Sequence, residues 1–215
     1  MTIVASFEKV LSPAERRAFA QLSSPIRIQE FLDSLAYNPE EGRFLSPLSV
    51  LREGMAHCFE GSVFAALALK KLGYRPLLVN MFPEEGTDDE HLLAVFRRKG
   101  GWGAVAKSNF VGLRYREPVY RDVRELVMSY FEQYYNVAKK RTLRSYTRPL
   151  SLEKFNSHHW PTSDEAMNRI DQRLDSLKRI PLLTRSMVDE LIPVDERSYQ
   201  SGLSGSNPAG LYKPT

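Results

Sequence analysis

The sequence predicts a single α+β domain over residues 1–196, followed by a flexible tail over residues 197–215. Three observations predict this fold class. Helix-start signals recur within residues 1–57, a broad apolar stripe covers residues 58–72, and segments with strand character then surround a Gly-Gly turn. The chain of 215 residues is long enough to build one sizeable core.

Composition and charge are those of an ordinary globular protein. Hydrophobic residues make up 42% of the chain, charged residues 26%, and the formal net charge is +4. This mild charge argues against nucleic acid as a main partner. No apolar run reaches the roughly 20 residues that span a bilayer, and the N-terminus lacks a secretory signal pattern. The single cysteine, Cys58, fits a reducing compartment, so we expect a cytoplasmic protein with no membrane partner.

Three short helices are expected within residues 1–57. Each begins at a serine followed directly by proline, the usual arrangement of an N-cap and a first helical residue. These serines are Ser12, Ser24 and Ser46. Glu15 completes a capping box at the first helix, and Gly54 ends the third.

The clearest helix spans residues 58–72, and its wide apolar stripe predicts a central, nearly buried position. Gly73 supplies its C-terminal stop. The pattern then changes to short strands, two of which form a hairpin centred on Gly100-Gly101. These strands are residues 75–81, 91–97 and 102–106.

Further elements follow the hairpin. Residues 113–120 predict another strand, with Pro118 favouring an edge position. A helix is expected over residues 122–135. A second, amphipathic helix is expected over residues 164–178, and Pro181 prevents its continuation.

One cysteine and one histidine occupy positions typical of catalytic groups. Cys58 begins the central helix, where unpaired amides and the helix dipole favour a thiolate and should lower its pKa below about 8.5. His91 begins a strand. In the predicted hairpin, facing residue numbers sum to about 200, which places Asn109 opposite His91. Nucleophile, base and orienting amide form a cysteine triad in this order, with Ser108 as the alternative orienting group.

These features resemble the transglutaminase-like branch of the papain-like cysteine fold. The resemblance lies in a cysteine that opens a helix, followed by two strands that carry His91 and the Gly101-Trp102 hairpin. Within this branch, the sequence resembles a group of bacterial transglutaminase-like proteins. This resemblance is carried by residues 57–61, 107–109 and 113–118. The resemblance implies a core over about residues 46–150, in which a central helix packs on a small antiparallel sheet, with additional N- and C-terminal helices.

The resemblance also implies functional roles. Cys58 would be the acyl-accepting nucleophile, His91 its acid–base partner, and Asn109 or Ser108 the group that orients the histidine. The family usually carries an aspartate shortly after the hairpin tryptophan, and residues 106–109 contain none. From these roles we expect a cysteine-dependent amide or peptide hydrolase or acyltransferase. Its Cys58 would form a thioester with the acyl group of a peptide or protein amide substrate. No cofactor is expected.

Two other functions remain open. The missing aspartate is compatible with an inactive transglutaminase-like module that binds a peptide or a partner protein. A nucleic-acid-associated protein would instead use aromatic side chains that precede a basic cluster. These aromatic residues are Tyr130, Tyr134 and Tyr135, and the basic residues are Lys139, Lys140 and Arg141.

The remaining polar candidates are expected to be structural. His57 and Glu60 flank Cys58 at the helix start, where a glutamate complements the positive helix end. His158-His159 lacks the cysteines or spaced carboxylates of a zinc site, so no metal is predicted. The tail would regulate the site if it reached the cleft.

Overall fold

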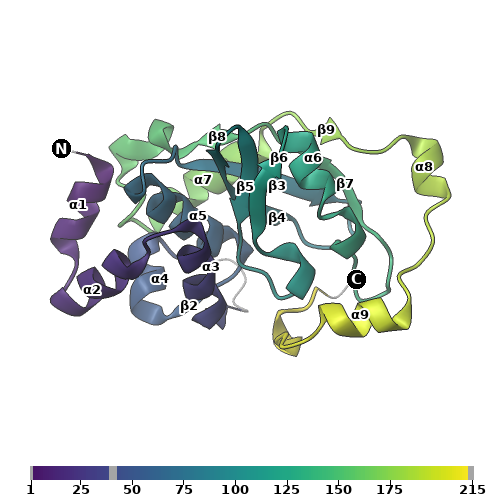
Figure 1. Ribbon diagram of the computed structural model, residues 1–215, viewed down its shortest axis with the longest axis horizontal. Coiled ribbons are helices and arrows are strands. Elements are labelled where there is room, and N and C mark those ends of the chain that lie inside the picture. Colours follow the sequence, from purple (N-terminus) through teal and green to yellow (C-terminus); the bar gives the residue numbers. More distant parts are fainter. Residues whose placement is uncertain (1, 39–42, 213–215) are drawn as a thin grey trace.

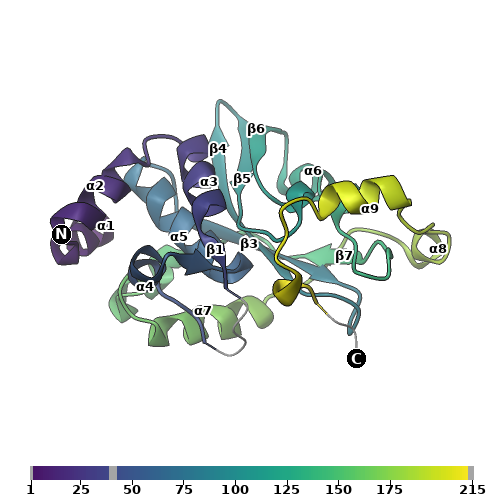
Figure 2. The same ribbon diagram turned by 90° about the horizontal axis from the view of Figure 1, so that it is seen from below.

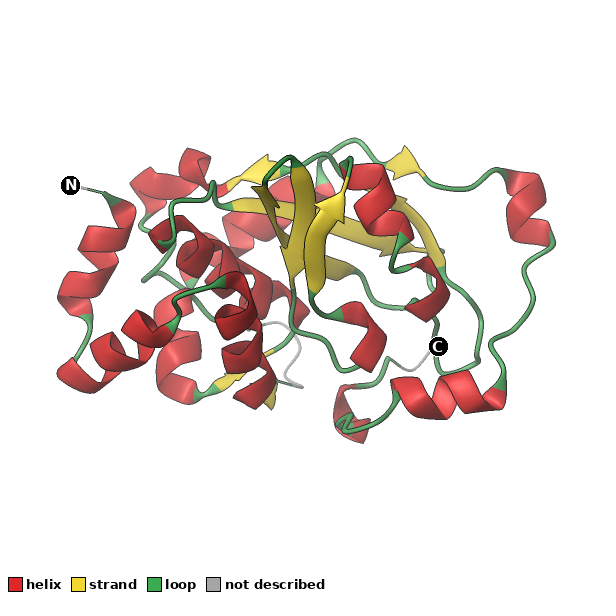
Figure 3. Ribbon diagram, viewed as in Figure 1, coloured by secondary structure: helices red, strands yellow, loops and turns green. Residues whose placement is uncertain are grey.

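The computed structural model describes residues 2–38 and 43–212 (Figure 1). Within these residues, seven strands form one antiparallel sheet in the order β6-β5-β4-β3-β7-β9, and β8 pairs with the same edge of β3 as β7. The strands are β3 (Leu77–Pro83), β4 (His91–Arg98), β5 (Gly101–Val105), β6 (Arg116–Tyr120), β7 (Leu143–Tyr146), β8 (Leu150–Ser151) and β9 (Ile180–Pro181). Figure 3 shows helices packed beside this sheet. The predicted α+β class and the antiparallel sheet are therefore confirmed.

The N-terminal helices begin where the serine-proline pairs predict. The side chains of Ser12, Ser24 and Ser46 each accept a hydrogen bond from a backbone N–H in the first turn of their helix. The helices are α2 (Pro13–Gln21), α3 (Pro25–Ser34) and α4 (Pro47–Glu53). An additional helix that was not predicted, α1 (Ile3–Val10), packs Phe7 against Phe19 of α2. A short parallel pair, β1 (Ala36–Tyr37) and β2 (Met55–Ala56), joins the ends of α3 and α4.

The central helix α5 (Cys58–Lys71) is buried from Phe59 to Leu69, as its apolar stripe predicts. It packs against β4 and against the N-terminal helices. Gly61 lets the chain after β5 approach closely, because a Cβ atom there would lie 2.4 Å from Cβ of Lys107. The helix therefore places Cys58, its first residue, beside the start of β4.

The sheet separates two hydrophobic cores, because alternate strand residues point to opposite faces. Leu92 and Ala94 join the core around α5, whereas Leu93 and Val95 join a second core around α6 (Val123–Met128).

The helix α6 is shorter than the helix predicted over residues 122–135, and the 3-10 turn η2 (Phe131–Gln133) follows it. Tyr130, Tyr134 and Tyr135 are each at most 1% exposed, so in this structure they are not available to stack on bases as the nucleic-acid alternative requires.

The hairpin between β4 and β5 keeps nearly the predicted register. Ala94 pairs with Val105 and Arg98 pairs with Gly101. The turn residues are Lys99 and Gly100, both with positive φ, so the turn lies one residue earlier than expected. Strand β5 ends at Val105, and the following chain leaves the sheet.

The C-terminal third is more ordered than its composition predicts. It contains the 3-10 helix η3 (Leu152–His158), α7 (Glu165–Asp175), which is slightly shorter than predicted, and α8 (Arg185–Asp189). Within residues 197–215, where a flexible tail is expected, the structure has α9 (Glu196–Gly202) and the short turn η4 (Pro208–Gly210), and residues 213–215 lie outside the described residues. Figure 2 shows this segment returning from α9 toward β1. None of the helices in the described part of the chain is long and apolar enough to cross a membrane.

Candidate functional site

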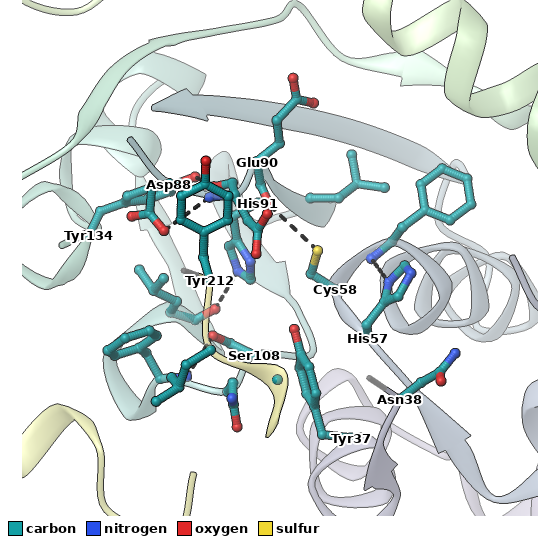
Figure 4. A pocket seen from close by; sticks show the side chains of 18 of the residues that line it. Tyr37, Asn38, His57, Cys58, Asp88, Glu90, His91, Ser108, Tyr134 and Tyr212 are labelled. Carbon is teal, nitrogen blue, oxygen red and sulfur yellow. Dashed lines mark hydrogen bonds between the residues drawn. The ribbon is translucent and has the colours of Figure 1, made fainter. Parts of the chain in front are cut away.

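A cavity of about 740 Å³ lies where the start of α5 meets the start of β4 (Figure 4). Further parts of its wall come from β1, the loop between β3 and β4, the loop after β5, α7 and the C-terminal segment. All four residues that the sequence singles out for catalysis line this cavity. These residues are Cys58, His91, Ser108 and Asn109. The fold therefore brings together groups that lie 51 positions apart in the sequence.

Cys58 is the first residue of α5, and its thiol faces the strand that carries His91. Its Sγ donates a hydrogen bond to the carbonyl oxygen of Glu90, at 3.6 Å, immediately before His91 in the chain. Burial raises the pKa of Cys58 to about 12, and the backbone N–H of Leu92 opposes that shift only in part. The expected lowering of this pKa is therefore wrong for this conformation, because desolvation outweighs the helix terminus.

His91 is the first residue of β4 and is only 5% exposed. Its Nε2 lies 2.7 Å from the carbonyl oxygen of Leu113, the last residue of the 3-10 turn η1 (Val111–Leu113). Because a carbonyl oxygen can only accept, Nε2 carries the proton in neutral imidazole and Nδ1 keeps the lone pair. Burial lowers the pKa of His91 to about 4, so the ring is a neutral base at physiological pH.

Asn109 and Ser108 lie in the cavity wall, but their hydrogen bonds go elsewhere. Ser108 accepts the backbone N–H of Phe110 through Oγ. The side-chain amide of Asn109 pairs with the backbone of Asn207 in the C-terminal segment. The Leu113 carbonyl is instead the group that orients His91. No residue-type signal in the sequence could have identified it, because every residue carries a backbone carbonyl.

His57 and Glu60 have the structural roles that were expected. They form a capping box at the start of α5, in which the Glu60 carboxylate accepts the backbone N–H of His57 at 2.9 Å. Glu60 is fully buried and also accepts the backbone N–H of Leu45 and the side-chain amide of Asn38. This carboxylate therefore ties the segments before α4 to the helix end that carries Cys58.

Acidic and tyrosine side chains complete the wall, and the sequence did not indicate them as parts of this site. Burial raises the pKa of Asp88 to about 6, although Thr142 donates a hydrogen bond to it. Burial also raises the pKa of Asp171 to about 6. The hydroxyl of Tyr134 donates to the backbone carbonyl of Asp89 and closes the wall behind His91. The cavity thus has an acidic rim around a neutral thiol–imidazole pair.

Metal binding is not indicated by this wall. Across residues 2–38 and 43–212, no group of three or more histidine, cysteine, aspartate or glutamate side chains is arranged to hold a metal ion. The site offers a thiol, an imidazole and backbone hydrogen-bond donors. These are the groups that acyl transfer requires.

A comparison of the chain with protein-family models finds no match, and a comparison with curated proteins finds none either.

Proposed function

We propose that the protein is a cysteine-dependent amide or peptide hydrolase or acyltransferase built on a transglutaminase-like, papain-like core. The observation that carries this proposal is the pairing of a helix-start thiol with an oriented neutral imidazole. Cys58 hydrogen-bonds to the carbonyl that directly precedes His91, and the Leu113 carbonyl leaves Nδ1 of His91 free to accept a proton.

The first half of the reaction forms a thioester. Nδ1 of His91 takes the thiol proton as Sγ of Cys58 attacks the carbonyl carbon of the amide. The backbone N–H of Cys58, at the start of α5, donates to the oxygen as its negative charge develops. The C–N bond then breaks, and His91 returns the proton to the departing amine.

The second half regenerates the thiol. His91 takes a proton from water or from an acceptor amine, whose oxygen or nitrogen bonds to the thioester carbon. The C–S bond breaks, and the proton passes from His91 to the sulfur of Cys58. Water yields a carboxylic acid and an amine yields a new amide, so the acceptor alone separates a hydrolase from an acyltransferase.

A second candidate function is an inactive module that binds a peptide in the same cavity. The observation that favours it is the neutral partner of His91. The Leu113 carbonyl stabilises an imidazolium less than a carboxylate would, because it carries no full charge. The pKa of Cys58 and the pKa of His91 are also shifted in directions that oppose proton transfer in this conformation.

Acyl-enzyme trapping tests the proposal against this alternative. The full-length protein is incubated with a small activated ester, and the acyl adduct on Cys58, the single thiol, is followed by intact mass. We expect His91→Gln to slow acylation by a factor of roughly 10²–10⁴, the usual contribution of a general base. Glutamine keeps a donor for the Leu113 carbonyl and removes only the base. The matched control is His158→Gln, in an exposed residue of η3.

Two outcomes are decisive. Acylation at the same rate in His91→Gln and in the wild type would overturn the enzyme proposal and favour the binding module. If the pair is active, release of the adduct in buffer and in buffer with added methylamine then distinguishes water from an amine as the acceptor.

A further inference from the structure

The C-terminal segment is held to the cavity wall by a two-way hydrogen-bond pair. The side-chain Nδ2 of Asn109 donates to the backbone carbonyl of Asn207 at 2.8 Å. The backbone N–H of Asn207 donates to Oδ1 of Asn109 at 2.7 Å. Asn207 has an extended backbone, so the side-chain amide of Asn109 pairs with its N–H and C=O as the backbone of a neighbouring strand would. Such a contact recognises a peptide backbone and is indifferent to the side chain.

A glycine three positions later lies against a tyrosine ring. A Cβ atom on Gly210 would lie 2.5 Å from both Cδ1 and Cε1 of Tyr37, and 3.3 Å from Nδ2 of Asn109. Tyr37 is itself part of the cavity wall. Even alanine at position 210 would therefore require the ring or the segment to move. The wall accepts glycine here and excludes larger residues.

The segment then runs into the cavity that holds the thiol. Ala209, Gly210, Leu211 and Tyr212 all line it. Figure 4 shows the chain with Tyr212 crossing the space that Cys58 and His91 border. On its other side, the Asn109–Asn207 contact borders a second hollow of about 290 Å³. The segment from Asn207 to Tyr212 thus borders two hollows, as a displaceable occupant would.

We propose that residues 207–212 occupy the substrate site of the cavity. This site takes a peptide in which one residue hydrogen-bonds to Asn109 through its backbone and the residue three positions later is glycine. The proposal rests on the proposed function and names its substrate class. The segment therefore acts as an internal competitor. It covers Cys58 and His91 until a substrate peptide takes its place at Asn109 and Tyr37.

Displacement also has a chemical consequence. The segment contributes to the wall that keeps water from the thiol and the imidazole. When it leaves, both groups gain solvent, and the cost of charging them falls. Substrate binding and activation of the thiol would be coupled through the same contacts.

The test uses the full-length protein and the rate of alkylation of Cys58 by iodoacetamide. Gly210→Val places methyl groups against Tyr37 and should detach the segment, so we expect a roughly tenfold faster reaction than in the wild type. The matched control is Ser201→Val, which places the same valine side chain at an exposed position of α9 and should keep the wild-type rate. An unchanged rate in Gly210→Val would overturn the proposal.

A peptide added in trans separates displacement from unfolding. A synthetic peptide of residues 205–212 should slow alkylation of the Gly210→Val protein back toward the wild-type rate, because it can refill the vacated site. The same peptide carrying G210V should not. Equal effects of the two peptides, or no protection by either, would contradict the proposed site. Protection requires a folded cavity, so an unfolded variant cannot imitate it.

This experiment and the test of the proposed function can fail independently. Loss of the His91 dependence of acylation, with protection by the peptide retained, would leave a peptide-binding cavity without catalysis. Retained His91 dependence with no effect of Gly210→Val would leave an enzyme whose C-terminal segment is merely structural.

Discussion

Nε2 of His91 lies 2.7 Å from the carbonyl oxygen of Leu113, so a backbone group holds this imidazole in its tautomer. The sequence pointed to Asn109 or Ser108 for this task. A carbonyl can hold the ring in place, but it offers no charge to stabilise an imidazolium. Proton transfer from Cys58 to His91 therefore depends strongly on how much water the cavity admits, because water stabilises the charged forms of both groups.

The first prediction concerns the pH dependence of stability. His91 has a pKa of about 4 in the folded protein, against 6.5 as its ordinary value. The unfolded chain therefore binds a proton at a higher pH than the folded protein does. The stability associated with neutral His91 is present above about pH 6.5 and is lost as pH falls through 4. The two values correspond to about 3 kcal/mol in the free energy of unfolding.

Urea unfolding at a series of pH values measures this effect. His91→Gln removes the titrating group and should flatten the pH dependence between pH 6.5 and 4. His158→Gln, in an exposed residue, is the control and should leave the slope unchanged. An equal slope in the wild type and in His91→Gln would contradict the shifted pKa.

The second prediction concerns the thiol. Because burial raises the pKa of Cys58 to about 12, the alkylation rate of the wild-type protein should keep rising with pH beyond about 9, without a plateau. A thiol with an ordinary pKa would instead level off in that range. Alkylation rates measured across this pH range, with a cysteine-containing peptide as reference, provide the comparison. A plateau at or below that of the reference would refute the prediction.

The third prediction concerns the buried carboxylate of Glu60, which caps the helix that begins at Cys58. Glu60→Ala would leave the backbone N–H groups of His57 and Leu45 without their acceptor in a dry environment. We expect a loss of about 3 kcal/mol in the free energy of unfolding, measured in urea. Glu15→Ala removes the equivalent glutamate from the capping box of α2, which lies nearer the surface, and should cost less. Equal losses in the two variants would show that burial of Glu60 is unimportant.

The fourth prediction concerns the close approach at Gly61. Alanine in a helix interior normally stabilises by about 1 kcal/mol relative to glycine. Gly61→Ala should instead destabilise by about 1–3 kcal/mol, because the new Cβ would meet Cβ of Lys107. Lys107→Ala keeps that atom and should not relieve the clash, whereas Lys107→Gly should. A double-mutant cycle in urea measures this coupling, and additive effects of Gly61→Ala and Lys107→Gly would contradict the packing argument.

Several features of this fold could be predicted because they depend on local chemistry. A serine before proline begins a helix wherever it occurs, so the starts of α2, α3 and α4 were readable. The apolar stripe of α5 predicted its burial. The hairpin signal predicted the pairing of β4 with β5 to within one residue. Cys58 and His91 could be brought to one cavity because each begins such an element.

Other features were decided by contacts between distant parts of the chain. The pKa of Cys58 depends on the balance between a helix terminus and burial, and burial is a property of the packed molecule. The third partner of His91 is a backbone carbonyl, which carries no sequence signature. The C-terminal composition suggested a flexible tail, yet Asn109 and Tyr37 supply partners for residues 207–212. The sequence by itself therefore determined the helix starts, the hairpin and the placement of Cys58 and His91 at the starts of neighbouring elements. The tertiary structure alone decided the environment that shifts the pKa values of these two groups and the segments that line their cavity, because desolvation and close contact arise only when the chain is packed.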